Sequence, residues 1–165
     1  MAERTRNSRF ESSDGVRCLL CVDDHPEVLA IMGEFLRVSG YSVLTAPSGA
    51  RGLQLLLRNP VDAVILDYEM PKMDGAELAL RIKSDRPELP VLMFTGYPAD
   101  VPEDIRRSVD AFVVKGDPAE KLLQTLRDLV PANGDGAPKE ASSQVRRLKR
   151  NGRSAPGVRR VRRPA

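Results

Sequence analysis

Short apolar runs alternate with amphipathic stretches along the middle of this chain, and the alternation restricts its fold more than any other feature. The runs have the length of strands, and they are Val16–Val22, Tyr41–Ala46, Val61–Leu66, Val91–Phe94 and Ala111–Val114. Each is followed by a stretch in which apolar residues recur at helical spacing. Strict alternation of strand and helix favours a parallel sheet with helices on both faces. The sequence therefore predicts an α/β fold of five βα units over residues 17–130.

The ends of the predicted helices carry recognisable signals. Pro26 suits a first helical turn, and Gly40 is expected to end that helix after an apolar series made of Val28, Ile31, Met32, Phe35 and Val38. Ser48 is a candidate N-cap for the second helix, and Asp74-Gly75 opens the third, which runs to about Lys83. The fourth helix, near Glu103–Val109, is expected to be brief or loose because its stretch is short and contains Pro98 and Pro102, and the fifth covers Pro118–Val130.

Both ends of the chain differ in composition from this middle region. Residues 1–16 and 131–165 have scarcely any apolar periodicity, so we expect disordered segments on either side of the domain. The net charge of +3 hides a division, since residues 17–130 carry −5 and residues 131–165 carry +8. The basic tail could bind nucleic acid or anionic membrane surfaces without sequence specificity. It lacks aromatic side chains for base stacking, which favours a solvated extension.

The compartment is expected to be the cytoplasm. No apolar run approaches the roughly 18 residues that a membrane-spanning helix needs. The first ten residues are polar and contain arginine, unlike a secretory signal. Cys18 and Cys21 lie within a predicted strand, so we expect them to act as small buried apolar residues.

Polar side chains follow four of the five predicted strands. Asp23-Asp24, Asp67, Thr95 and Lys115 come after the first, third, fourth and fifth strands, and ligands bind at this edge of open parallel sheets. Closely packed carboxylates repel one another unless a cation lies between them, and oxygen ligands of this kind suit Mg²⁺. A carboxylate such as Asp67 can be a nucleophile that forms an acyl phosphate. Mg²⁺, Thr95 and Lys115 would then offset the charge of the transferred phosphoryl group.

These motifs resemble the receiver domain of bacterial two-component response regulators, in the stand-alone, chemotaxis-regulator-like form. The resemblance rests on Asp23-Asp24, on LDYEMPKMDG at residues 66–75, on Thr95-Gly96 and on Phe112–Lys115. It covers about residues 17–130. It implies a flavodoxin-like, doubly wound fold with five parallel strands in the order 2-1-3-4-5.

The resemblance also implies a role for each site residue. Asp67 would be the phosphoacceptor, and Lys115 would pair with its phosphoryl group. Thr95 would move to hydrogen-bond that group while the aromatic switch Phe112 rotates inward. Mg²⁺ would be bound by the side chains of Asp24 and Asp67, by the main-chain carbonyl of Glu69, and through a water by Asp23.

Two positions depart from the family pattern. Gly116 follows the lysine where the family usually has a proline with a cis peptide bond, so this loop is expected to be trans and to present Lys115 differently. Glu69 places a carboxylate two residues after the phosphoacceptor, and we expect it to alter the lifetime of the acyl phosphate.

The resulting prediction is a signalling switch rather than an enzyme, with only self-phosphorylation and self-dephosphorylation activity. It would accept phosphoryl groups from a histidine kinase or a phosphotransfer protein and act through a downstream effector protein. The alternatives are a phosphorylation-independent adaptor and a binder that uses the basic tail. A phosphatase of the haloacid-dehalogenase type would need a DxD motif, where this chain has Asp23-Asp24-His25. His25 is expected to be an exposed loop residue, and Tyr97 either shapes access to the site or is simply exposed.

Overall fold

A single five-stranded parallel sheet forms the centre of the computed structural model, which describes residues 16–131. The strand order is β2-β1-β3-β4-β5, as predicted. The strands are β1 (Cys18–Val22), β2 (Ser42–Ala46), β3 (Ala63–Leu66), β4 (Val91–Thr95) and β5 (Ala111–Val114). Every pairing is parallel, so all five carboxyl ends lie at the same edge.

Five α-helices follow the strands in turn. They are α1 (Pro26–Val38), α2 (Gly49–Arg58), α3 (Gly75–Asp85), α4 (Glu103–Ser108) and α5 (Ala119–Leu129). A 3₁₀ turn, η2 (Pro98–Asp100), precedes α4. The fourth helix has only six residues, which confirms the expectation that it is brief. Other boundaries differ from the sequence prediction by one or two residues, the usual uncertainty at fraying ends.

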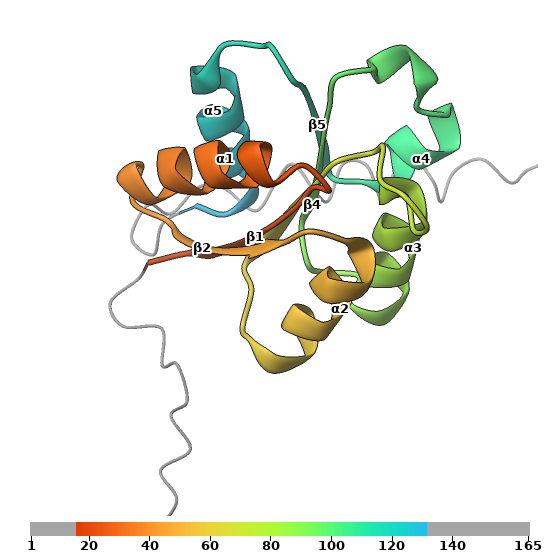
Figure 1. Cartoon of the computed structure of the whole chain (residues 1–165), viewed down its shortest axis with the longest axis horizontal. Coiled ribbons are helices and arrows are strands. Elements are labelled where there is room, and N and C mark those ends of the chain that lie inside the picture. Colours follow the sequence, from red (N-terminus) through yellow and green to blue (C-terminus); the bar gives the residue numbers. More distant parts are fainter. Residues whose placement is uncertain (1–15, 132–165) are drawn as a thin grey trace, which may run out of the picture. The chain divides into compact units, whose positions relative to one another are not determined.

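The sheet separates two apolar layers. In Figure 1, α1 and α5 lie on one face, while α2 and α3 lie on the other. The layer beneath α1 and α5 contains Leu36 and Leu126, both fully buried. The opposite layer contains Leu78 of α3 and Ile105 of α4. Because both faces are covered, the central strands are apolar throughout, and every residue of β3 is buried.

The apolar series that marks the first helix in the sequence only partly coincides with the side that α1 buries. Leu29, Met32 and Leu36 pack against the sheet, whereas Ile31 is 73 % exposed and Val38 is also exposed. Ile31 lies along an apolar groove of about 420 Å³ between α1 and α5. Helical spacing identified the helix correctly, but α1 carries more apolar surface than the sheet can cover.

Local contacts explain where two of the helices begin. The hydroxyl of Ser48 accepts a hydrogen bond from the backbone N–H of Arg51 at 3.3 Å, and the carboxylate of Asp74 accepts one from Glu77 at 2.8 Å. Both are N-caps of the predicted kind. Gly75 passes so close to the Asp67 carbonyl and the Tyr68 backbone that a Cβ would not fit. The loop after β3 therefore packs tightly against the start of α3.

The prediction that the cysteines are small buried apolar residues holds fully for Cys21 alone. Both are free thiols, Cys21 is fully buried, and Cys18 at the start of β1 is only partly buried. Burial raises the pKa of Cys21 to about 12, with the nearby Asp23 charge acting in the same direction and Arg37 opposing. This thiol is therefore protonated and unreactive at neutral pH.

The expected disordered segments and the basic tail lie outside the described residues, apart from Val16 and Pro131. Across residues 16–131, no helix is both long enough and apolar enough to cross a membrane.

Candidate functional site

The register of the central strands places Asp23 beside Asp67. Val22 is aligned with Leu66, and each aspartate is the next residue along its strand. Neighbouring strands are about 4.8 Å apart, so the two carboxylates have to emerge close together. Asp23 is fully buried and Asp67 is 5 % exposed. Sheet geometry alone thus produces a buried pair of like charges.

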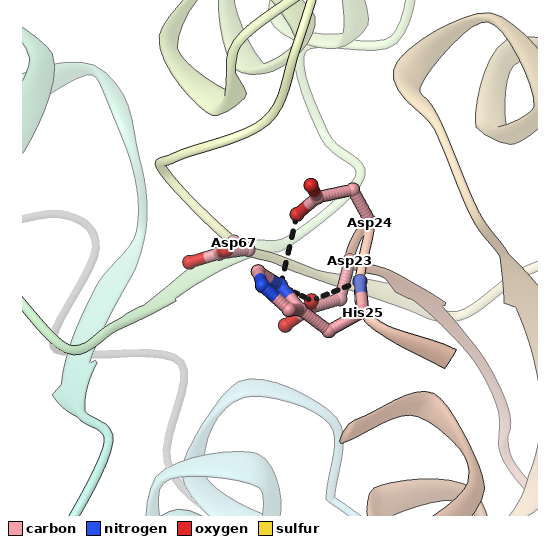
Figure 2. Close-up of side chains that lie close together, drawn as sticks. All are labelled: Asp23, Asp24, His25 and Asp67. Carbon is pink, nitrogen blue, oxygen red and sulfur yellow. Dashed lines mark hydrogen bonds and ion pairs between the residues drawn. The ribbon is translucent and has the colours of Figure 1, made fainter. Parts of the chain in front are cut away.

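Two more polar side chains complete a cluster at this edge. Oxygen or nitrogen atoms of Asp23, Asp24, His25 and Asp67 all lie within 4.8 Å of one another (Figure 2). Asp24 Oδ1 is buried and accepts no hydrogen bond from any described residue. His25 Nδ1 lies 3.0 Å from it, an ion-pair distance without hydrogen-bond geometry. A buried carboxylate oxygen that accepts no hydrogen bond would be stabilised by a bound cation.

Lys115 crosses from β5 to join the two buried aspartates. Its Nζ is 2.6 Å from Asp23 Oδ2 and 3.2 Å from Asp67 Oδ1. One ammonium group therefore bridges the acidic pair, and Lys115 itself remains only partly exposed. The predicted meeting of the first, third and fifth strand ends is confirmed.

The loop after β5 explains how Lys115 reaches this position without a proline behind it. The described residues contain no cis peptide bond, and Gly116 has φ 106°, a conformation that favours glycine. The carboxylate of Asp117 accepts a hydrogen bond from Val114 N–H at 3.1 Å, and Lys115 N–H donates to the Thr95 carbonyl at 2.7 Å. The trans geometry predicted for this loop is therefore observed, and it still delivers Lys115 to the acidic pair.

The electrostatic balance at Asp67 is unfavourable in the absence of a further cation. Burial raises the pKa of Asp67, the Lys115 charge opposes this, and the Asp23 charge adds to it. For Lys115, burial acts to lower the pKa, but the hydrogen bond to Asp23 and the charge of Asp67 outweigh it and raise the pKa. Lys115 is thus held in its charged form, and it does not fully compensate for the carboxylates.

His25 is exposed, as expected, but it is not isolated. Its backbone N–H donates to Asp23 Oδ1 at 2.9 Å, and its Nδ1 lies 3.2 Å from the same oxygen. The hydrogen bond to Asp23 and the charge of Asp24 raise the pKa of the imidazole. The sequence showed that His25 neighbours the acidic pair, and the turn that folds its ring back onto the carboxylates is visible only in the structure.

The two predicted switch residues lie on β4 and β5, the strands that follow β3 in the order of the sheet. Thr95 is buried at the end of β4, and its hydroxyl accepts a hydrogen bond from Tyr97 N–H at 3.2 Å rather than contacting Asp67. Phe112 is partly buried against the layer beneath α4, and the Arg106 guanidinium lies 4.9 Å from the centre of its ring. Tyr97 is 61 % exposed, so its side chain does not close the site.

The donor set fits Mg²⁺. Its protein donors, apart from the imidazole, are carboxylate oxygens, and one of them lacks a hydrogen-bond partner. Glu69 is exposed on the loop after β3, which leaves its main-chain carbonyl as the predicted contribution. The site thus has the chemistry of a magnesium centre with a neighbouring ammonium group.

Two residues of the site were not identified from the sequence. Asp117 follows a glycine and precedes a proline, a pattern typical of a turn, so its role in shaping the Lys115 loop had a local signal. Arg106 had none, because its contact with Phe112 depends on how α4 packs beside β5.

Comparison with known proteins agrees with this geometry. The family model described as the response regulator receiver domain matches residues 19–127. The transcriptional regulatory protein GlrR of Escherichia coli (strain K12) is 39 % identical over 113 residues, which is 67 % of this chain and 25 % of GlrR. The response regulator MprA of Mycobacterium sp. (strain KMS) is 33 % identical over 127 residues, or 73 % of this chain and 55 % of MprA. The chain thus spans about a quarter to a half of the length of these relatives.

Solved structures show the same similarity. The response regulator TrrA from Thermotoga maritima, in complex with Mg²⁺–BeF, has a TM-score of 0.64 and 29 % identity over 69 % of this chain and 99 % of TrrA. TrrA in complex with the histidine kinase ThkA gives a TM-score of 0.66 and 29 % identity, over 70 % of this chain and 99 % of that one. The family model covers most of the described region, and the strand order and polar edge agree with it, so this chain belongs to the response regulator receiver domain family.

Proposed function

We propose that this chain is a phosphorylation-dependent signalling switch that accepts a phosphoryl group on Asp67 from a histidine kinase or a phosphotransfer protein. The observation that supports it best is the position of Lys115, whose Nζ contacts the carboxylates of both Asp23 and Asp67. The relation to TrrA, solved in complex with the histidine kinase ThkA, supports the choice of donor. A cytoplasmic location, expected from the sequence, is part of this proposal.

The chemistry follows from the charges at the site. An oxygen of ionised Asp67 attacks phosphorus, the bond from phosphorus to the donor histidine nitrogen breaks, and that nitrogen keeps the electron pair. Lys115 is positioned to pair with an oxygen of the transferred group because its ammonium is already beside Asp67. Hydrolysis of the acyl phosphate by water later restores the carboxylate and releases inorganic phosphate.

A magnesium ion is the proposed cofactor, held by the side chains of Asp24 and Asp67, by the Glu69 main-chain carbonyl and through water by Asp23. When bound, it supplies positive charge for the phosphoryl oxygens and relieves repulsion among the carboxylates. The Asp24 oxygen that accepts no hydrogen bond from the described residues supports this assignment.

The output is proposed to run through Thr95 and Phe112. Thr95 would exchange its hydrogen bond to Tyr97 N–H for one to the phosphoryl group, and Phe112 would rotate inward beside it. The resulting change at α4 and β5 would be recognised by an effector protein. The chain is therefore assigned a switching role, with self-phosphorylation and self-dephosphorylation serving that role.

The alternative of a phosphorylation-independent adaptor would be favoured if Gly116 kept Lys115 away from the acidic pair. The observed contacts do not favour it. The alternative that uses the basic tail depends on residues outside the described region.

The test is labelling with acetyl phosphate and Mg²⁺, followed by intact-mass measurement. We expect a single phosphoryl adduct that disappears in Asp67→Asn and when Mg²⁺ is removed with EDTA. Asp74→Asn is the matched control, because Asp74 caps α3 and asparagine is an equally good N-cap. Equal labelling of Asp67→Asn and the wild type would refute the assignment of the phosphoacceptor.

A further inference from the structure

The guanidinium group of Arg106 makes three contacts that no other side chain in the described region combines. Its Nε donates to the Val101 carbonyl at 3.2 Å, and its Nη2 donates to the Pro98 carbonyl. Its Cζ lies 4.9 Å from the centre of the Phe112 ring. One planar cation on α4 thus ties the loop that follows Thr95 to the aromatic residue of β5.

Besides Arg106, the loop is held by the buried side chain of Val101 and by a backbone hydrogen bond from Asp100 to the Tyr97 carbonyl at 3.2 Å. The loop runs from Thr95 to the start of α4, and neither η2 nor α4 has a side-chain cap at its N-terminus. The Pro98 carbonyl also accepts a long backbone bond from Val101 N–H at 3.4 Å. The guanidinium fork can bind both carbonyls while its face stacks on the ring, a combination that a lysine ammonium cannot reproduce.

From these contacts we propose that Arg106 is a positioning residue that stabilises the unphosphorylated arrangement of the switch. The inference rests on the proposed function, in which Thr95 and Phe112 both move. Phe112 can rotate inward only by leaving the guanidinium, and Thr95 can shift only if the adjoining loop shifts. Arg106 contacts both the Phe112 ring and the loop that follows Thr95, so it opposes both movements at once and couples them.

Thermodynamic linkage makes this role of Arg106 measurable as a change in ligand affinity. A contact present only in the unphosphorylated arrangement lowers the affinity for any ligand that favours the other arrangement. A cation–π contact of this kind corresponds to roughly a 2- to 5-fold change in an equilibrium constant. With the loop contacts added, loss of Arg106 is expected to shift the equilibrium by about 3- to 10-fold.

The experiment measures binding of beryllofluoride, a stable phosphoryl mimic, to the full chain at fixed Mg²⁺ by ¹⁹F NMR. Arg106→Ala should bind it about 3- to 10-fold more tightly than the wild type, and Arg106→Lys should lie between them. In the absence of beryllofluoride, the amide signals of Thr95 and Phe112 in Arg106→Ala should move toward their bound positions. A merely structural role would weaken binding or leave these signals unchanged.

Arg107→Ala is the matched control. Arg107 neighbours Arg106 on α4 and carries the same charge, but its side chain is 78 % exposed and pairs with Glu103 at 3.0 Å. Its removal should change beryllofluoride affinity by less than about twofold, as expected for an exposed ion pair. In a Phe112→Leu background, the effect of Arg106→Ala should shrink, because the ring contact is already absent.

The outcomes separate the two proposals. Suppose that the wild type binds beryllofluoride and Asp67→Asn does not, while Arg106→Ala behaves like Arg107→Ala or binds more weakly than the wild type. The proposed role of Arg106 is then wrong, and the proposed switch function still stands. If the wild type does not bind at all, both proposals fail. Thermal unfolding of each variant shows whether α4 remains folded, and Arg106→Lys preserves the test if Arg106→Ala does not.

Discussion

Two groups of residues around Asp67, which form the Lys115 side and the Thr95 side of the site, are organised in opposite ways. On the Lys115 side, Lys115 already contacts both buried aspartates, and Asp117 fixes the loop that carries it. On the Thr95 side, the Thr95 hydroxyl accepts a hydrogen bond from Tyr97 N–H, and the following loop is held by Arg106. In the proposed reaction, the Lys115 side needs no rearrangement before the phosphoryl group arrives, whereas the Thr95 side has to give up existing contacts.

We expect the Lys115 side to determine the rate of the proposed phosphoryl transfer and the Thr95 side to determine the signalling response. A cation in place beforehand needs no rearrangement when charge develops on the phosphoryl group, which favours a fast reaction. A threonine and an aromatic ring held in other contacts respond only when the new interactions are strong enough to replace those contacts. Substitutions on the two sides should therefore have different consequences.

The largest effect is expected for Lys115→Met, which removes the preformed cation. Labelling by acetyl phosphate should slow by about 100-fold, the typical loss when one charge-stabilising donor is removed. The measurement is the initial rate by intact mass, and Lys115→Arg, which keeps the charge, should recover part of it. The control is Lys121→Met, which removes an exposed lysine that pairs with Asp117 and does not contact Asp23 or Asp67 among the described residues. A rate for Lys115→Met within threefold of the wild type would mean that this side is not arranged for the chemistry.

The next effect tests whether the same side holds the metal. Mg²⁺ that binds only the folded chain should raise the free energy of unfolding by about 3 kcal/mol at one hundred times its dissociation constant. Asp24→Asn should weaken Mg²⁺ binding by about tenfold or more, because a charged ligand close to the ion is lost. Thermal unfolding at increasing Mg²⁺ measures both quantities, with Asp74→Asn as the control. Equal Mg²⁺ stabilisation of Asp24→Asn and Asp74→Asn would contradict the proposed ligand set.

The smallest effect is a gain in stability without metal. The raised pKa of Asp67 means that its ionised form disfavours folding, so Asp67→Asn should unfold a few degrees higher than the wild type at neutral pH. This gain should be complete above the folded-state pKa and should shrink as the pH falls through it, vanishing near the ordinary value of 3.8, where both states become protonated. Unfolding curves across pH in EDTA provide the measurement. A lower melting temperature for Asp67→Asn would show that Lys115 outweighs the burial of the carboxylate.

The positions of the strand ends were predictable because the carboxyl ends of parallel strands lie at the same edge of a sheet. Asp23, Asp67 and Lys115 could be assigned to one edge from the end of each apolar run, and the structure confirms this. The exposure of Ile31 and Val38 on α1 could not be predicted, because spacing shows that a helix is amphipathic but not how much apolar surface its neighbours cover. The contact between Arg106 and Phe112 was equally hidden, since it joins two elements whose relative position only packing decides.

The alignment of Val22 with Leu66 restricts which insertions and deletions this chain can tolerate. Deleting or inserting one residue within β3 would turn Asp67 toward the opposite side of the sheet, because successive strand residues alternate in direction. A two-residue change would restore the direction but displace the carboxylate by nearly 7 Å from its neighbours. Loops at the other edge of the sheet carry none of these groups. We therefore expect insertions to be tolerated in those loops and not in the strands.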